Sequence, residues 1–268
     1  MAVTVIIPAR YDSTRFPGKP VYPLRGKPLI QHTYENAQGS KLTSDIIVAT
    51  DHEVIYNTVL SFGGKAVMTD AKHPSGTDRI AEVAHSLACD IIVNVQADEP
   101  LIRPEMIDDV VSLLDDKRAA MGSLVKKIEE ADEIMDPNIV KAVFDREGFA
   151  LYFSRAPIPF HRDTWKLQYE KNQDSSANSP EYVLDTTDPH LAMQQIFKHI
   201  GIYSYRRDVL LALSRMKPTE LEQIEKLEQL RALENGLKIK LRETLFETFG
   251  VDTPADLERV EKCLSLSS

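Results

Sequence analysis

Cysteine is scarce in this 268-residue chain, where Cys89 and Cys263 are the only two and lie far apart. A disulfide framework or a thiolate metal site needs several cysteines at short spacings, so we expect two free thiols in a reducing compartment. The 7 histidines show no H-E-x-x-H or comparable spacing, which argues against a zinc site. No G-x-S-x-G elbow occurs, and covalent catalysis is therefore not indicated.

Long apolar runs and an excess of positive charge are also absent. No stretch approaches the roughly 18 apolar residues of a transmembrane helix. The amino terminus, MAVTVIIPAR, lacks the basic region and cleavage site of a signal peptide. We therefore expect a cytoplasmic protein without membrane insertion. The formal net charge of -9 would repel a nucleic-acid backbone, so free nucleotides are favoured over polymers as ligands.

Short β-branched runs alternate with helical patterns in the first part of the chain. Strands are predicted at VTVIIP, DIIVAT, KAVMT and DIIVNVQ, with helices near residues 30–40, 53–62 and 78–88 between them. This alternation predicts an α/β fold with a mainly parallel central sheet and crossover helices on its faces. Ligands of such sheets bind beyond the carboxyl ends of the strands, so the residues after each strand are the candidates for function.

The region of residues 121–205 is less regular. Strand-like segments at 121–125, 139–144, 150–154 and 201–205 predict a smaller, partly antiparallel layer, either a subregion or a dimer surface within one domain that spans residues 1–268. Between residues 162 and 198 the chain turns polar, and we expect a long loop that is a lid, an interface arm or simply mobile.

Near the end of the chain, PTELEQIEKLEQLRALENG predicts a single helix. Thr219 is its expected N-cap, Glu222 completes a capping box, and Asn235-Gly236 stops the helix. A broad apolar stripe, buried against more than one neighbour, is predicted from residues that recur at every third position: Leu221, Ile224, Leu227, Leu230 and Leu233.

The stretch IIPARYDSTRFPGKP follows the first predicted strand and holds three cations, Arg10, Arg15 and Lys19, against one acid. Neither G-x-x-x-x-G-K-S/T nor G-x-G-x-x-G occurs, which excludes the two familiar backbone cradles for phosphates. The side chains of the two arginines, of Lys19 and of Ser13 would instead hold a polyphosphate. The alternative is a solvated basic loop that makes surface ion pairs.

Two acidic positions are candidates for a metal site. Asp98, in NVQADEP, follows a buried strand, and Mg²⁺ needs only one or two carboxylates when substrate phosphates complete its shell. The alternative for Asp98 is a turn residue. Asp252 stands before a helix that Thr253 caps and Pro254 begins, so it is either a second metal ligand or an acid favoured by the helix dipole.

The motif HPSGTDRI precedes the third predicted helix. Gly76 permits close backbone approach, while Ser75 and Thr77 offer hydroxyls, of which we expect that of Thr77 to cap the helix. A helix amino end with free amides also suits a base carbonyl or an anion, so capping and ligand binding are compatible here.

Taken in order, IIPARYDSTRFPGKP, RGKPLI, ATDHE, HPSGTDR, VNVQADEP, ALYFSRAPIP, KHIGIYSYR, LEQLRALENG and GVDTPADLERV resemble the 3-deoxy-manno-octulosonate cytidylyltransferase (CMP-Kdo synthetase) family nearly end to end. The resemblance implies a Rossmann-like nucleotidyltransferase fold with a smaller mixed α/β dimerisation region, and a homodimer. It also implies the Mg²⁺-dependent reaction of CTP with Kdo, an eight-carbon sugar acid, to give CMP-Kdo and pyrophosphate for lipopolysaccharide biosynthesis.

Carried over by position, the resemblance assigns roles to individual residues of this chain. The phosphate loop falls on Arg10, Ser13, Arg15 and Lys19, of which Arg15 and Lys19 would serve mainly the β and γ groups. The metal-binding acids fall on Asp98 and Asp252. Cytosine recognition falls on Pro8, Ala9 and Arg10, and on Ser75 and Gly76. Sugar-acid binding falls on Gln96, Arg155, His199 and Tyr203, with Glu222 as a weaker candidate because its capping box already accounts for it.

Two features depart from the family pattern. Ala97 replaces the glycine of Q-G-D-E-P, and its methyl group would tighten the site or shift substrate preference. The segment 162–198 is longer than usual, so an 8-amino-3,8-dideoxy analogue of Kdo is an alternative substrate. A nucleotide-sugar-dependent glycosyltransferase would share the sheet and a metal acid but would not need the cationic loop. A non-catalytic nucleotide-binding protein would be expected to lack a phosphate cation or a metal acid.

Overall fold

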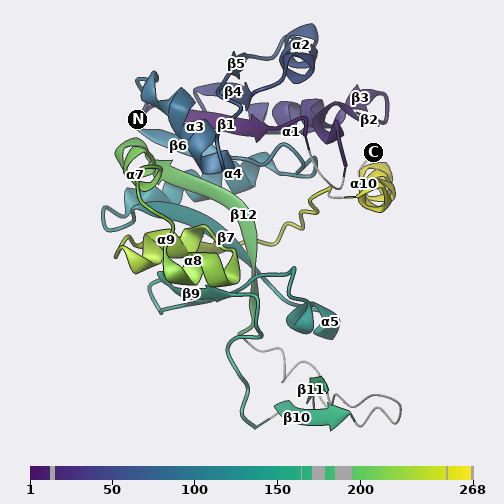
Figure 1. Ribbon diagram of the computed structural model, residues 1–268, viewed down its shortest axis with the longest axis vertical. Coiled ribbons are helices and arrows are strands. Elements are labelled where there is room, and N and C mark those ends of the chain that lie inside the picture. The colour runs from purple at the N-terminus through teal and green to yellow at the C-terminus, as the bar shows by residue number, and fades with distance from the viewer. Residues whose placement is uncertain (13–15, 164, 171–178, 185–194, 252, 267–268) are drawn as a thin grey trace.

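A computed structural model of the protein describes residues 1–12, 16–163, 165–170, 179–184, 195–251 and 253–266 (Figure 1). The strands are β1 (Val3–Ala9), β2 (Pro23–Leu24), β3 (Lys27–Pro28), β4 (Asp45–Thr50), β5 (Ala66–Met68), β6 (Ile91–Asn94), β7 (Met121–Lys127), β8 (Lys141–Phe144), β9 (Ala150–Ser154), β10 (Trp165–Glu170), β11 (Ser179–Leu184), β12 (Phe197–Arg206) and β13 (Ile239–Glu243). The helices are η1 (Lys19–Val21), α1 (Leu29–Gln38), α2 (Glu53–Ser61), α3 (Gly76–His85), α4 (Pro104–Ser112), η2 (Leu113–Asp115), α5 (Ala131–Met135), α7 (Arg207–Leu213), α8 (Glu220–Glu225), α9 (Gln229–Glu234) and α10 (Pro254–Leu266).

Within the described residues, a 9-stranded sheet runs in the order β13-β7-β12-β6-β1-β4-β5, and β8 and β9 continue it from β12. β1 pairs in parallel with β4 and β6, β4 with β5, and β13 with β7. The predicted α/β class with a mainly parallel sheet is therefore confirmed. β12 is the strand that runs against its neighbours β6, β7 and β8.

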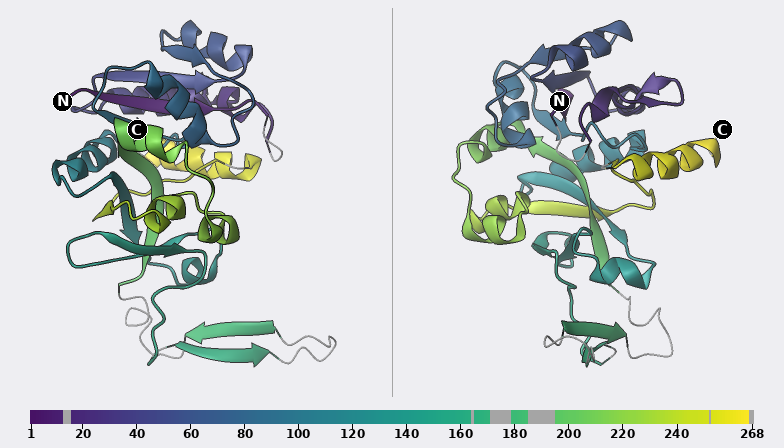
Figure 2. Two further views of the ribbon diagram at one scale, coloured as in Figure 1. Left: turned by 60° about the vertical axis from the view of Figure 1, so that its left-hand side comes forward. Right: turned by 45° about the vertical axis from the view of Figure 1, so that its right-hand side comes forward.

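The core lies on both faces of this sheet, and the first strand is buried from end to end. Every residue of β1 is buried, and successive side chains point to opposite faces. Ile7 belongs to an apolar cluster with Met106 of α4, whereas Ile6 joins a second cluster with Ile80 of α3 and Leu210 of α7. Burial of each such side chain contributes about 2 kcal/mol. Figures 1 and 2 show the resulting three layers, with helices on either side of the sheet.

The strands predicted between residues 121 and 205 form, but not as a separate layer. β7, β8, β9 and β12 extend the central sheet, and the antiparallel pairing that was expected comes from β12 with β7 and β8 and from β8 with β9. The strand predicted from Ile139 begins at Lys141, whose Nζ donates to the carbonyls of Asp136 and Ile139 in the preceding turn over 2.9 and 2.6 Å.

The long helix predicted after Pro218 is wrong as a single element, because α8 ends at Glu225 and α9 begins at Gln229. The expected capping box is present, with the Thr219 amide donating to Glu222 Oε2 over 3.1 Å, and Gly236 (φ 74°) follows the end of α9. The apolar stripe repeats every third residue, so one straight helix would carry it around to solvent. The break buries Leu227 and leaves Ile224 69% exposed.

Part of the predicted polar loop also has regular structure. β10 and β11 form a 2-stranded antiparallel sheet of their own, with Trp165 opposite Leu184. This hairpin lies at the far end of the molecule from β1 and β5 (Figures 1 and 2). Residues 171–178 and 185–194 of the predicted loop lie outside the described residues.

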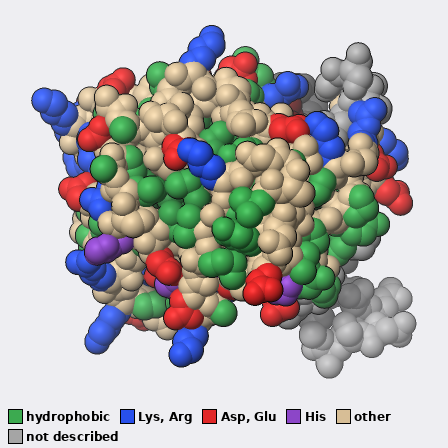
Figure 3. Space-filling view, turned by 90° about the horizontal axis from the view of Figure 1, so that it is seen from above, with side chains coloured by type: hydrophobic (Ala, Val, Ile, Leu, Met, Phe, Trp, Pro, Cys, Tyr) green, Lys and Arg blue, Asp and Glu red, His purple; other side chains and the backbone are tan. Residues whose placement is uncertain are grey.

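The end of the molecule formed by α2 and β5 mixes charged and apolar side chains on its surface (Figure 3). Val54 and Leu60 of α2 and Val67 and Met68 of β5 are all exposed. β5 is an edge strand of the sheet. Because it has only 3 residues, it exposes few unpaired backbone groups. In the part of the chain described, no helix is both long and apolar enough to cross a membrane.

Candidate active site

The carboxyl ends of β1 and β6 open onto a cavity of about 400 Å³, which we call the loop cavity. It is lined by Pro8, Ala9, Arg10, Asp12, Lys19, Pro20, Gly76, Gln96, Ala97 and Asp98. The sequence predicted functional residues directly after these strands, and the structure brings the described ones together here. Ser13 and Arg15, also predicted for this loop, lie outside the described residues.

Within the loop cavity, the cation of Lys19 pairs with the acid that follows β6. Lys19 Nζ lies 2.5 Å from Asp98 Oδ2, although the two residues are 79 positions apart in the sequence. Lys19 is 9% exposed, so its charge would be costly to hold there without a counter-ion. Asp98 is therefore the counter-ion of Lys19 in this structure.

The cationic loop is closed by a backbone bond and a stacked ring. Gly18 has φ 71° and donates its amide to the carbonyl of Tyr11 over 2.9 Å, which returns the chain to the cavity at Lys19. The Tyr11 ring stacks on His52 with centroids 4.1 Å apart. Arg10 Nη2 donates to the carbonyl of His73 over 2.6 Å, which ties the loop to the segment before α3.

The residues around Asp98 fit a magnesium ion that substrate phosphates complete. The described residues contain no cluster of three or more acidic, histidine or cysteine side chains that could hold a metal unaided. Mg²⁺ does not need one, since one or two carboxylates suffice beside phosphates and waters. Asp252, the second predicted ligand, lies outside the described residues, but the amide of Val251 donates to the Asp98 carbonyl over 2.9 Å.

The helix after Asp252 begins as the sequence predicted. Thr253 precedes α10, and both its amide and its hydroxyl donate to Asp256 Oδ2, over 2.7 and 2.9 Å. Val251 and Leu257 share an apolar cluster with Phe16 of the cationic loop. The carboxyl-terminal helix therefore packs against the loop whose cation pairs with Asp98.

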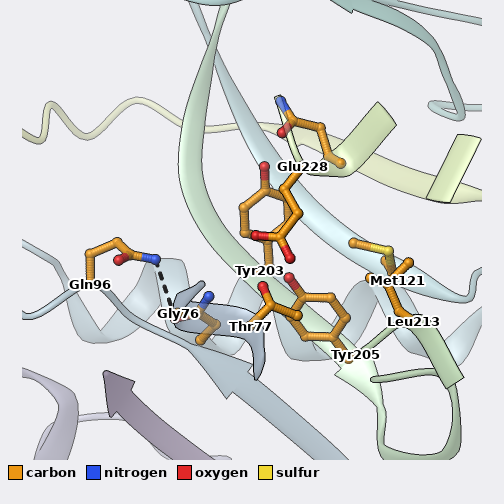
Figure 4. Close-up of a pocket in the computed structure, with 10 residues that line it drawn as sticks. Gly76, Thr77, Gln96, Met121, Tyr203, Tyr205, Leu213 and Glu228 are labelled. Atoms are coloured by element: carbon orange, nitrogen blue, oxygen red, sulfur yellow. Dashed lines mark hydrogen bonds between the residues drawn. The ribbon is translucent and has the colours of Figure 1, made fainter. Parts of the chain in front are cut away.

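A second cavity of about 230 Å³, the tyrosine cavity, is drawn in Figure 4. It is lined by Gly76, Thr77, Asn94, Gln96, Met121, Tyr203, Tyr205, Leu213, Glu228 and Gln229. Gly76 and Gln96 line both cavities, so they form the wall between them. Gln96 Nε2 donates to Asn94 Oδ1 over 3.3 Å, which holds its side chain at this wall.

The amino end of α3 reaches both cavities, but its cap differs from the prediction. Ser75, not Thr77, is the N-cap, and its hydroxyl accepts the Asp78 amide over 3.1 Å. The helix therefore starts two residues earlier than expected. Thr77 is instead a buried residue of the first turn, and in Figure 4 it lies beside the carboxylate of Glu228.

Glu228 and Gln229 are site residues that sequence reasoning missed, because both were placed inside a single core helix. In Figure 4 the Glu228 carboxylate points towards Thr77 and Tyr205. Burial raises its pKa, and among the described residues its Oε1 has no hydrogen-bond partner. Two adjacent polar residues between Leu227 and Leu230 were the available signal, since a core helix rarely buries such a pair without a partner.

Of the predicted sugar-binding residues, Gln96 and Tyr203 line the tyrosine cavity. His199 lies behind Tyr203, with ring centroids 5.2 Å apart, and its Nε2 is 2.8 Å from Ser123 Oγ. Burial lowers the pKa of His199 to about 3 and raises that of Tyr203 well above its ordinary value, so both rings are neutral.

Like His199, the other two predicted sugar-binding residues line neither cavity. Arg155 Nε donates to the carbonyl of Glu225 over 2.7 Å. Glu222 accepts two hydrogen bonds from Arg231, over 2.5 Å to Oε1 and 2.8 Å to Oε2. Both side chains are engaged with the segment around α8 and α9.

Ala97 occupies the position where the family pattern has glycine. Ala97 is 7% exposed and belongs to the apolar cluster beneath the loop cavity. Its carbonyl accepts from Thr33 Oγ1 over 3.3 Å. The extra methyl group is thus accommodated by packing.

Known proteins of similar sequence and structure are cytidylyltransferases. A family model described as cytidylyltransferase matches residues 4–239. The 3-deoxy-manno-octulosonate cytidylyltransferases of Geobacter metallireducens and Thermodesulfovibrio yellowstonii are 50% and 48% identical, over 99% and 100% of this chain and 98% and 100% of theirs. A CMP:2-keto-3-deoxy-manno-octonic acid synthetase solved with CTP has a TM-score of 0.84 at 39% identity, with both chains covered completely. A cytidylyltransferase from Leptospira borgpetersenii, with a TM-score of 0.60 at 17% identity over 99% of this chain and 87% of that one, shares the fold alone. The chain therefore belongs to the 3-deoxy-manno-octulosonate cytidylyltransferase family.

Proposed function

We propose that the loop cavity holds CTP and the tyrosine cavity holds the sugar acid, in a chain that activates Kdo with CTP to give CMP-Kdo and pyrophosphate. The observation that carries this division is the common wall of Gly76 and Gln96. Substrates in the two cavities would both reach Gly76 and Gln96, and would meet beside these residues near the strand end where Lys19 and Asp98 lie. That is the arrangement a transfer between a nucleotide and a sugar needs.

The loop cavity suits a nucleoside triphosphate by its charge. Arg10 and Lys19 line it, and Arg15 and Ser13 stand in the same loop by sequence. Forked and point cations bind phosphate oxygens strongly when partly desolvated. Ser75 and Gly76 begin α3, whose free amides and positive end favour an anion or a base carbonyl. The related synthetase named above was solved with CTP bound, which supports this choice.

Asp98, with Asp252 by sequence, would hold Mg²⁺ beside the triphosphate. When bound, the ion supplies charge neutralisation for the phosphates. The Val251–Asp98 backbone bond supports a common site for the two acids, because it places the residue before Asp252 next to Asp98. Lys19, now paired with Asp98, would serve the β and γ phosphates.

The tyrosine cavity suits a polyhydroxylated sugar. Glu228 offers an unpartnered carboxylate oxygen to hydroxyl groups, and Tyr203, Gln96 and Gln229 add polar contacts. Glu222 and Arg155 have no place in this proposal, since their side chains are held elsewhere.

The chemistry then needs no protein nucleophile. The anomeric hydroxyl of the sugar acid attacks the α-phosphorus in line, a P–O bond forms, and the bond to the β-phosphate oxygen breaks to release pyrophosphate. The protein residues orient the two substrates, and Arg10 and Lys19 offset charge on the triphosphate.

A substrate panel tests the proposal. Pyrophosphate release should be seen with CTP plus Kdo, and should be much lower with other nucleotides, with neuraminate and with the 8-amino analogue of Kdo. Full-length relatives named for Kdo favour it over the amino analogue, and the family disfavours a nucleotide-sugar-dependent glycosyltransferase. Silence with CTP and every sugar acid would overturn the proposal. The homodimer and the cytoplasmic location stay predictions, the first measurable by light scattering.

A further inference from the structure

We propose that Arg155 and Glu222 are positioning residues that hold Glu228 and Gln229 towards the tyrosine cavity, and that neither touches the sugar. The proposal rests on the function proposed above, because it takes the tyrosine cavity as the sugar site. Its basis is the segment between α8 and α9, residues 226–228, which we call the helix break. Arg155 and Glu222 each bind on a different side of it.

The helix break is a conformation that its own sequence disfavours. Lys226 has φ 55° and ψ 45°, which is left-handed backbone in a residue other than glycine. Such a conformation costs about 1–2 kcal/mol. The residues on either side are good helix formers, so an uninterrupted helix is the local alternative. Contacts from elsewhere in the fold must therefore hold the break open.

Arg155 supplies the first of these contacts from the end of β9. Its Nε donates to the carbonyl of Glu225 over 2.7 Å and its Nη2 to that of Lys226 over 3.4 Å, while Nη1 is anchored on the carbonyl of Pro137 over 2.8 Å. The last carbonyls of a helix lack intrahelical partners, and the guanidinium satisfies them here. The Glu225 carboxylate in turn accepts a hydrogen bond from Ser154 Oγ, next to Arg155, over 2.6 Å.

Glu222 supplies the second contact across the break. Its carboxylate, on α8, binds the guanidinium of Arg231, on α9, through both oxygens. Arg231 also donates to the carbonyl of Leu213, which lines the tyrosine cavity, over 3.4 Å. Glu222 and Arg231 are 9% and 6% exposed, so the pair is poorly screened and fixes the two helices relative to each other.

Between these two contacts, the chain places Glu228 and Gln229 side by side on the cavity wall. Glu228 immediately precedes α9 and Gln229 is its first residue. If the break closed into a helix, both side chains would rotate with the backbone. Arg155 and Glu222 therefore act on the sugar through the orientation of Glu228 and Gln229.

The test compares Arg155→Met with the double variant Arg155→Met/Lys226→Gly. Arg155→Met should raise the KM for Kdo by at least about tenfold, with the KM for CTP within about threefold of the parent protein. Glycine at 226 removes the left-handed cost, so the double variant should recover a threefold or greater part of the lost kcat/KM for Kdo. Lys226→Gly alone and Arg215→Met, a change at an exposed arginine, are the controls and should match the parent.

Hydrogen exchange, measured by mass spectrometry on the free protein, supplies the readout besides activity. Amides of residues 226–230 should exchange faster in Arg155→Met and in Glu222→Gln than in the parent protein, and Lys226→Gly should slow them again in the double variant. Glu222→Gln leaves Arg231 unpaired. If that variant does not fold, Arg155→Met still tests the proposal. Unchanged exchange together with no rescue by glycine would overturn the proposal and indicate direct contact of Arg155 with the sugar.

Failure of the proposed function would look different. Glu228→Gln tests the tyrosine cavity directly, because this residue lines it. A normal KM for Kdo in that variant would remove the sugar from this cavity whatever Arg155 does. A raised KM in Glu228→Gln with a normal KM in Arg155→Met would overturn the positioning role alone.

Discussion

Lys19 Nζ and Asp98 Oδ2 are 2.5 Å apart, so the lysine of the cationic loop is already paired with the acid at the predicted metal site. The side chains are 11% and 30% exposed, which leaves their attraction only partly screened by water. A divalent ion bound to Asp98 would meet the ammonium group at the same carboxylate. Lys19 and the metal would therefore compete for this carboxylate when no triphosphate is bound.

Lys19→Met should consequently have two opposite effects. The affinity of the free protein for Mn²⁺, measured by electron paramagnetic resonance without nucleotide, should rise by about tenfold, because the competing cation is gone. The kcat/KM for CTP, measured by pyrophosphate release, should fall by at least about tenfold, because one well-placed charged donor is worth about 2–4 kcal/mol to a transition state.

Lys27→Met is the matched control for this experiment. Lys27 pairs with Glu35 at the surface, with side chains 47% and 39% exposed, so its loss should change neither quantity. An unchanged Mn²⁺ affinity in Lys19→Met would refute the competition, and near-normal turnover would remove Lys19 from the mechanism.

Gly18→Ala should impair CTP binding through the shape of the loop. Gly18 has φ 71°, and an added Cβ would lie 3.3 Å from the Tyr11 ring, which closes the loop. Gly26 offers the comparison, since it has φ 81° and no atom lies within 4 Å of its Cβ position in the described structure. Both alanine variants should lose about 1 kcal/mol of stability, which corresponds to a Tm lower by about 2 °C.

Only Gly18→Ala should raise the KM for CTP, by at least about threefold, because only there does the methyl group press on the loop. Steady-state kinetics on both variants separates the two effects. Equal KM values in Gly18→Ala and Gly26→Ala would mean that the Tyr11 contact does not shape the nucleotide site.

The sequence was most informative where local pattern and fold topology agree. The alternation of apolar runs predicted the parallel strands, and the rule that ligands bind beyond strand ends placed Lys19 and Asp98 at one site. The bond from the Thr253 amide to Asp256 and the capping box at Thr219 also follow from short-range chemistry. These features depend on neighbours in the chain or on the common direction of strands.

The helix break could not be predicted because its causes lie outside its own sequence. Nothing in EKLEQL signals a left-handed Lys226, and the contacts that hold it come from Arg155, 71 positions away. Glu228 was not predicted as a site residue for the same reason, because it was placed inside a single helix. The start of α3 was misplaced by two residues for a simpler reason, since Ser75 and Thr77 are both good caps and the local sequence does not distinguish between them.

Glu228→Gln should weaken sugar binding specifically. The carboxylate has an unpartnered oxygen in the described structure, and a hydroxyl of the sugar would be its natural donor. We expect the KM for Kdo to rise by at least about tenfold, because a hydrogen bond to a charged group is worth about 1.5–3 kcal/mol, with the KM for CTP nearly unchanged. Glu220→Gln, at an exposed position of α8, is the control. A parallel rise in the KM for CTP would contradict the separation of the two cavities.

His199 should make the stability of the protein fall with pH in the acid range. Burial lowers its pKa from 6.5 to about 3, whereas in the unfolded chain it titrates near 6.5. Between these values the unfolded state binds the proton and the folded state does not, so stability is present above pH 6.5 and is lost as pH falls towards 3. The rings of Phe153 and Tyr203 pack on the imidazole, and Tyr203 stays neutral throughout, so neither offers a compensating charge.

Between pH 7 and 5, the free energy of unfolding should therefore fall by about 1–2 kcal/mol more in the parent protein than in His199→Gln, as measured by urea unfolding. Glutamine keeps an amide for Ser123 but cannot be protonated in this range. His85→Gln removes an exposed histidine and should follow the parent protein. If His199→Gln kept the full pH dependence of the parent, then the imidazole would be solvated well enough to take up its proton in the folded state, and the packing between Tyr203 and Phe153 would open to water.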